Sequence, residues 1–179
     1  MILDPEIHLH EIDCPKLPSK CYCSRVSWIW ASLPDRPSPT NSGKWMLFPS
    51  ADYVDNNWNR VKDLLCDRRI GSCAKVSTAA HANKNFLICI YTDDHNNIPD
   101  VFRVLKAVRQ SRLSLQSISY KTDDATYQGI YASNSKALPV SKYTSPKVID
   151  KLSLIENVIG PTQKVIIVIA DKQVTYSMR

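Results

Sequence analysis

Two stretches of the chain repeat apolar residues at the three- and four-residue spacing of an amphipathic helix. The first runs from about residue 50 to 67, and its apolar positions are Val54, Trp58, Val61, Leu64 and Leu65. The second begins near Pro99 and runs to about Arg112, with an apolar stripe of Val101, Leu105 and Val108. Each stripe predicts a helix that buries one face against another layer of the domain.

Basic side chains repeat at three-residue steps along the second predicted helix. They are Arg103, Lys106, Arg109 and Arg112. Such a row is typical of a solvated helix face, and a row of contacts to an anionic ligand is the alternative. We favour the solvated face, which explains the spacing without a ligand.

Shorter apolar segments predict strands on both sides of these helices. Their approximate ranges are 22–30, 44–49, 72–79, 85–92, 115–121 and 164–170. Short polar turns, such as residues 81–84, join consecutive segments and favour antiparallel pairing. Two amphipathic helices beside such strands predict an α+β domain, in which a curved antiparallel sheet has helices packed on one face.

The remaining segments are polar or rich in proline. We expect residues 1–24 to form an N-terminal extension and residues 25–179 a single α+β domain. Residues 33–43 contain three prolines and polar turn formers, which predicts a mobile surface loop. Residues 122–129 read as a polar turn, residues 133–146 as a loop and residues 146–152 as a short helix.

Alternation along three predicted strands places a lysine of each on the same side of the sheet. If the apolar set of each strand faces the helices, Lys44, Lys75 and Lys121 face the other way, with Ser77 and Ser119 beside them. Like charges gathered on one surface repel each other, and an anionic ligand removes that cost. The alternative is that the three strands lie far apart and their lysines simply face water.

Trp28 and Trp30 share one face of their strand because they are two residues apart. On the side of the lysines they would form an aromatic platform, and stacking on such a platform stabilises a bound base by about 1–3 kcal/mol. On the helix side they would be ordinary core residues.

The net charge of +6 and the pI near 9.0 favour anionic partners, although the chain has no block of five like charges. The six cysteines lack the paired spacing of a zinc site, so we expect no metal and no cofactor. The longest apolar run, residues 164–170, is too short to span a bilayer. With no secretory signal visible, we expect a cytoplasmic protein, with the nucleus as an alternative location.

Five segments carry a resemblance to a known family: residues 42–48, 74–78, 88–92, 120–123 and 126–130. In this order they resemble the Bles-type family of basophilic-leukaemia-expressed proteins, whose function is unassigned, over about residues 25–150. That family is grouped with the cap-binding translation initiation factor 4E. The resemblance implies a curved antiparallel sheet with helices on its convex side.

The cap-binding factors stack methylated guanine between two tryptophans, read the base with an acidic residue and hold the triphosphate with basic residues. The resemblance implies that Trp28 or Trp30 takes one stacking position. It places Lys44, which precedes Trp45, where those factors carry a phosphate-binding arginine. Ala31 follows Trp30, so the chain departs from the pattern at the base-reading acid.

The function that we predict is binding, without catalysis, of a phosphorylated nucleotide or the 5′ end of an RNA on the concave face of the sheet. The predicted ligand-binding residues are Trp28, Trp30, Lys44, Lys75, Ser77, Ser119 and Lys121.

Two alternatives remain. Some members of the family that this chain resembles carry a phosphothreonine-lyase label. The resemblance therefore implies, as the first alternative, an enzyme that cleaves phosphoesters with residues of the same face. Lys75 or Lys121 would then be the base and His81 or Tyr120 the acid. The second alternative is a scaffold whose helices bind a protein partner.

Overall fold

The fold is described from a computed structural model of the chain. The structure describes residues 16–34, 39–131, 140–147, 153–156, 163–169 and 172–178. Parts of the predicted N-terminal extension (residues 1–15), of the predicted loop (residues 35–38) and of the predicted short helix (residues 148–152) lie outside these ranges.

Both amphipathic helices form where their apolar stripes predict them. Helix α1 spans Ala51–Cys66 after Ser50, and helix α2 spans Ile98–Gln110. The side chain of Asn97 caps α2 by accepting a hydrogen bond from the backbone N–H of Asp100, and a proline lies in the first turn. The buried residues of each helix include its whole predicted stripe, so burial against the sheet fixes both helices.

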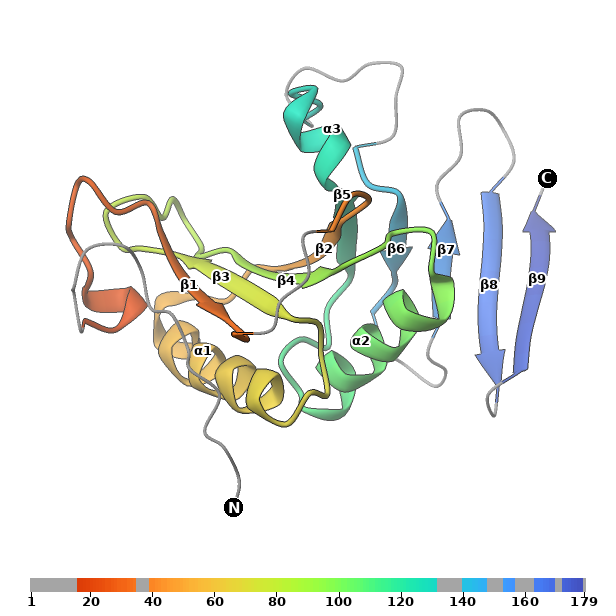
Figure 1. Cartoon of the computed structure of the whole chain (residues 1–179), viewed down its shortest axis with the longest axis horizontal. Helices are drawn as coiled ribbons and strands as arrows, with labels where there is room; N and C mark the ends of the chain where they lie inside the picture. Colours follow the sequence, from red (N-terminus) through yellow and green to blue (C-terminus); the bar gives the residue numbers. More distant parts are fainter. Residues whose placement is uncertain are drawn as a thin grey trace.

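The strands form one antiparallel sheet in the order β1-β3-β4-β2-β5-β6-β7-β8-β9 (Figure 1). Their bounds are β1 Trp28–Ser32, β2 Gly43–Leu47, β3 Cys73–Ser77, β4 Ile88–Thr92, β5 Ile118–Thr122, β6 Tyr143–Ser145, β7 Ser153–Glu156, β8 Gln163–Ile169 and β9 Lys172–Met178. Helices α1 and α2 lie on the same side of the sheet, and the short helix α3 lies on the other (Figure 1). The predicted class, a curved antiparallel α+β sheet with helices on one face, is confirmed.

Three local predictions were wrong. The strand expected over 22–30 begins only at Trp28. The expected polar turn at 122–129 contains helix α3, Asp123–Tyr127, which Thr122 caps by accepting a hydrogen bond from the N–H of Ala125. The expected loop at 133–146 contains β6, whose three residues are too few to show an alternating pattern.

The core lies between the sheet and the two long helices. Trp45 of β2 is fully buried there, and its indole N–H donates a hydrogen bond to the carbonyl of Val101 at the start of α2. The ring of Tyr120 packs edge-on against Trp45, with 5.3 Å between ring centroids. This packing sends the alternate residues of β2 and β5 to the opposite face, as the alternation predicts.

Part of the predicted N-terminal extension packs on the domain. The 3₁₀ turn η1, Pro18–Lys20, places Ser19 where its backbone N–H donates to Asp55 of α1 at 2.9 Å. Cys21 follows it and is fully buried in the core. The boundary that we predicted at residue 24 therefore lies inside a packed segment.

Arg109 departs from the predicted solvated face of α2. Its side chain is buried, and one terminal nitrogen donates to the carbonyls of Ser114 and Gln116, each at 2.7 Å. The other donates to Ser145 Oγ at 3.0 Å and to the carbonyl of Pro146 at 3.1 Å. Burial lowers the pKa of the guanidinium. This residue joins the end of α2 to the segments before β5 and after β6.

We expect Arg109→Met to destabilise the fold by about 2–4 kcal/mol, because it leaves several buried carbonyls without a donor. Urea unfolding of the variant and the native chain measures the difference. Lys106→Met is the matched control, since Lys106 is exposed on the same helix, and it should change stability by less than about 0.5 kcal/mol. Equal effects of the two substitutions would contradict the structural role of Arg109.

Candidate functional site

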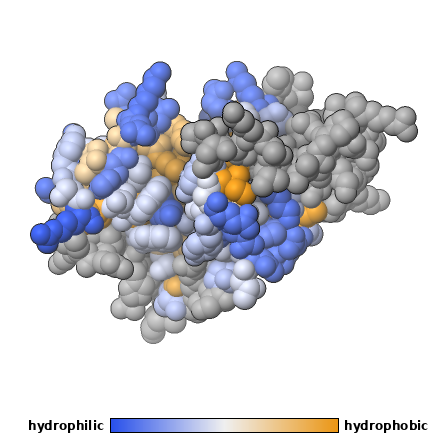
Figure 2. Space-filling view, turned by 90° about the horizontal axis from the view of Figure 1, so that it is seen from above, coloured by the Kyte–Doolittle hydropathy of each residue, from blue (hydrophilic) through white to orange (hydrophobic). Residues whose placement is uncertain are grey.

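The candidate site is the concave face, defined here as the face of strands β1–β6 opposite α1 and α2. One row of directly paired residues crosses it from β1 to β5. The row contains Trp30, Lys75, Cys89, Met46 and Ser119. Figure 2 views the molecule from this side, where small hydrophobic patches lie between hydrophilic residues. The faces predicted by alternation for β2, β3 and β5 are therefore correct.

The three predicted lysines do lie on this one face. Lys44 and Lys121 are direct partners in the β2–β5 register. Lys75 lies two strands from Lys44, on the far side of β4. Their surroundings differ sharply, and these surroundings decide which of them can meet a ligand.

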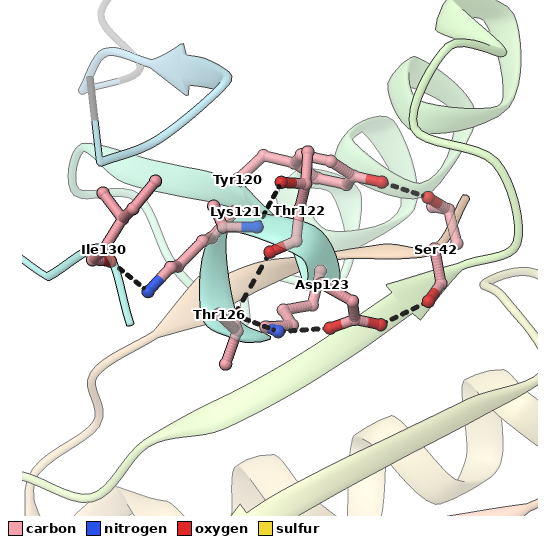
Figure 3. A network of polar contacts seen from close by, with 10 residues as sticks. Ser42, Tyr120, Lys121, Thr122, Asp123, Thr126 and Ile130 are labelled. Atoms are coloured by element: carbon pink, nitrogen blue, oxygen red, sulfur yellow. Dashed lines mark hydrogen bonds and ion pairs between the residues drawn. The ribbon is translucent and has the colours of Figure 1, made fainter. Parts of the chain in front are cut away.

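Lys44 already has an anionic partner within the chain. Its side chain is buried and forms an ion pair with Asp123, at the start of α3. The ammonium also donates to Thr126 Oγ1 at 2.8 Å, and Ser42 donates to the second oxygen of Asp123 (Figure 3). Thr126 Oγ1 donates in turn to the carbonyl of Thr122 at 3.1 Å. Helix α3 therefore covers the Lys44 ammonium and neutralises its charge.

Asp123 was missed by the sequence argument, which read residues 122–129 as a polar turn. A usable signal was present, because Thr122 followed by two acidic residues is typical of a capped helix start. What the sequence did not show is that this helix would lie against the start of β2.

Lys121 is also satisfied locally. Its ammonium donates to the carbonyl of Ile130 at 2.6 Å (Figure 3) and lies 3.7 Å from the ring centroid of Tyr131. Burial lowers the pKa of Lys121, and the charge of Lys44 lowers it further. Lys121 therefore binds the segment after α3 and is only 3% exposed.

Lys75 has a different environment, made of aromatic rings. Its ammonium lies 4.2 Å from the ring centroid of Trp28, 4.9 Å from that of Trp30 and 5.9 Å from that of Tyr91. Trp30 and Tyr91 stack on each other, with 5.8 Å between centroids. No carboxylate among the described residues forms an ion pair with Lys75. We call Lys75 and these three rings the aromatic cage.

Burial is the largest influence on the charge of Lys75, and it lowers the pKa of this lysine below its ordinary 10.5. Cys89, the direct β4 partner of Lys75, is buried, and burial raises the pKa of its thiol to about 11. Cys89 is therefore uncharged at neutral pH and does not neutralise Lys75. The half-buried lysine keeps its cation beside the rings without a negative charge in contact.

The other predicted site residues are placed as follows. Trp28 and Trp30 face the concave side and are half-buried, so they are not core residues. Ser77 is buried, and its hydroxyl oxygen accepts a hydrogen bond from the N–H of Leu87 at 2.9 Å. Ser119 is half-buried opposite Met46 of β2. No group of three metal-ligating side chains exists within the described ranges.

The residues proposed as general acids do not pair with the lysines. Tyr120 is fully buried on the helix side of the sheet, the opposite face from Lys75 and Lys121. Burial raises the pKa of its phenol, which is hydrogen-bonded to Thr92. His81 lies in the β3–β4 turn with Nε2 3.1 Å from the carbonyl of Ser24. Tyr120 therefore cannot act as the acid that the lyase alternative pairs with Lys75 or Lys121.

Comparison with solved structures identifies the class of fold. Schistosome eIF4E bound to m7GpppG and 4E-BP matches with a TM-score of 0.51 and 15% identity, over 65% of this chain and 69% of that one. Its complex with m7GpppA and 4E-BP gives a TM-score of 0.50 at the same identity and coverage. C. elegans eIF4E-3 bound to Mextli and a cap analog gives 0.49 and 11% identity, over 60% and 70% of the chains. The two schistosome structures therefore show that the fold is eIF4E-like.

A family model narrows this class. The model described as basophilic leukemia-expressed protein Bles03 matches residues 36–129, more than half of the chain. The chain belongs to this family. The matched region contains strands β2–β5, helices α1–α3 and all three lysines, whereas Trp28 and Trp30 precede it. In the part of the chain that the structure describes, no helix is long and apolar enough to cross a membrane.

We expect Asp123→Asn to destabilise the fold by about 1–3 kcal/mol, because the buried Lys44 ammonium loses its counter-charge while the amide keeps the shape. Thermal or urea unfolding measures the loss. Asp124→Asn is the matched control, since Asp124 is exposed in the same turn of α3. If both variants are equally stable, the ion pair of Lys44 does not hold α3 in place.

The lowered pKa of Lys75 predicts a pH dependence of stability. Between this pKa and 10.5 the unfolded chain binds more protons at Lys75 than the folded chain does, so folding is favoured as pH rises through that range. The free energy of unfolding of the native chain, minus that of Lys75→Met, should therefore increase from pH 7 to about 10.5. Urea unfolding at a series of pH values tests this, and a constant difference would contradict it.

Proposed function

We propose that the concave face binds a phosphorylated nucleotide or the phosphorylated 5′ end of an RNA, without catalysing a reaction. One observation carries this proposal: the Lys75 ammonium is held among three aromatic rings, and no described carboxylate is in contact with it. Phosphate would supply the missing negative charge, and an indole ring would supply a stacking surface for a base.

The proposed roles of the lysines follow from their partners. Lys75 contacts the phosphate. Lys44 and Lys121 are already bound by Asp123 and by the Ile130 carbonyl, so they shape the end of the face and hold α3. The role that the resemblance gave to Lys44, a direct phosphate contact, would require α3 to leave this position.

The half-buried position of Lys75 strengthens the expected contact. An ion pair that is partly shielded from water is screened less by salt than an exposed one. The proximity of Trp28 and Trp30 also provides a direct readout, because indole fluorescence responds to a ligand at this distance.

We expect RNA with a 5′-triphosphate to bind at low salt and to quench tryptophan fluorescence, and the same RNA with a 5′-hydroxyl to bind at least about tenfold more weakly. Lys75→Met should reduce affinity for the triphosphate by about tenfold, because it removes the one contacting cation. Lys106→Met is the control, since this exposed lysine lies on α2 behind the sheet. Equal affinity for the two RNA ends would overturn end recognition.

The same titration tests the phosphoester-cleaving alternative. Chromatography of the nucleotide after incubation reveals any cleavage product. If a product forms with the native chain and not with Lys75→Met, the protein is an enzyme and the proposal of binding without catalysis is wrong. A protein partner on the helices stays a prediction, for which the exposed Tyr53 of α1 offers one point of contact.

A further inference from the structure

A pocket of about 440 Å³ opens at one end of the concave face, beside the aromatic cage. It lies where β1 begins, where β2 ends and where the β3–β4 turn closes. Its lining residues are Ser27, Trp28, Phe48, Ser77, His81, Ala82, Asn83, Lys84, Asn85 and Leu87. Only Trp28, Ser77 and His81 of this set were candidate binding or acid residues in the sequence analysis, so the other lining residues add to the site.

Two aromatic side chains form walls of this pocket. Trp28 comes from β1 and Phe48 from the residue after β2, and β1 and β2 are three positions apart in the sheet. At about 4.8 Å per strand, the two backbones are separated by about 14 Å, so Trp28 and Phe48 line opposite sides of the pocket, with Ser77 and Leu87 of the intervening segments between them. Phe48 is 56% exposed, so core packing does not explain its position.

The turn between β3 and β4 supplies polar groups around this space. Asn83 and Asn85 are exposed, and each amide presents both a donor and an acceptor, as the edge of a nucleobase does. Ser77 accepts a hydrogen bond from Leu87, and its hydroxyl hydrogen can still be donated. The pocket therefore combines an apolar wall with groups that can read a base.

The charge of the pocket restricts which base it can accept. None of its ten described lining residues is acidic, and Lys84 is among them. Just beyond the wall, the Lys75 ammonium lies 4.2 Å from the Trp28 ring centroid. A positively charged base stacked on Trp28 would meet this cation with no carboxylate to offset it, whereas a neutral base would not.

We propose that this pocket binds the uncharged nucleobase of a nucleotide, stacked on Trp28 with Phe48 opposite and with Asn83 or Asn85 at the base edge, while Lys75 contacts the phosphate. The inference rests on the proposed function and adds the ligand class. The pocket selects an ordinary purine or pyrimidine nucleotide and disfavours one with a cationic, 7-methylated guanine.

The first experiment is a calorimetric titration of the full chain with GTP, 7-methyl-GTP and inorganic tripolyphosphate at low salt. GTP should bind at least about tenfold more tightly than 7-methyl-GTP, because only the methylated base is cationic. Tripolyphosphate should bind more weakly than GTP, since it lacks the base. Equal or tighter binding of 7-methyl-GTP would overturn the inference and leave phosphate binding intact.

Variants locate the base independently of the phosphate. Phe48→Ala and Asn85→Ala should each weaken GTP binding by about five- to fiftyfold and leave the affinity for tripolyphosphate unchanged. Both residues are exposed, and Tyr53→Ala, an exposed aromatic on α1, is the matched control. If Lys75→Met weakens GTP binding and Phe48→Ala does not, the pocket assignment is wrong and the proposed function stands. If neither GTP nor tripolyphosphate binds, both the pocket assignment and the proposed function are wrong.

Discussion

The ion pair between Lys44 and Asp123 is the interaction on which the concave face depends. A lysine held on a strand between Tyr91 and Lys121 is largely removed from water, and a buried cation is costly unless charges or hydrogen-bond acceptors in contact compensate it. Asp123 supplies this charge from within the chain by beginning a helix directly after β5. The pair therefore decides both where α3 lies and how much of the sheet it leaves open.

Lys75 shows what happens where no described carboxylate forms an ion pair with a lysine of this face. Three aromatic rings stabilise its charge instead, and a ring face attracts a cation far less strongly than a carboxylate does once both are shielded from water. The lysine is left with a lowered pKa. Lys44 and Lys75 lie on one face but have different environments, because only Lys44 is in contact with a carboxylate among the described residues.

The sequence predicted the features of the fold that depend on the periodicity of apolar residues. The apolar stripes predicted both long helices, and alternation predicted the correct face for Lys44, Lys75 and Lys121, whereas for Trp28 and Trp30 it predicted only that they share a face. It failed where partners come from elsewhere in the chain. Arg109 has the spacing of a surface residue, but carbonyls of later segments surround it. No local pattern reveals such an environment, and the pairing of Asp123 with Lys44, 79 positions apart, was hidden for the same reason.

The residues that fix the fold are separate from those that line the concave face. The eIF4E-like architecture follows from the core face, where Trp45 and Tyr120 pack beneath α2. Ala31, next to Trp30 on β1, is buried on the core side and offers no carboxylate to the concave face. A shared fold can thus carry a different charge pattern, because residues of the concave face can change without disturbing the core.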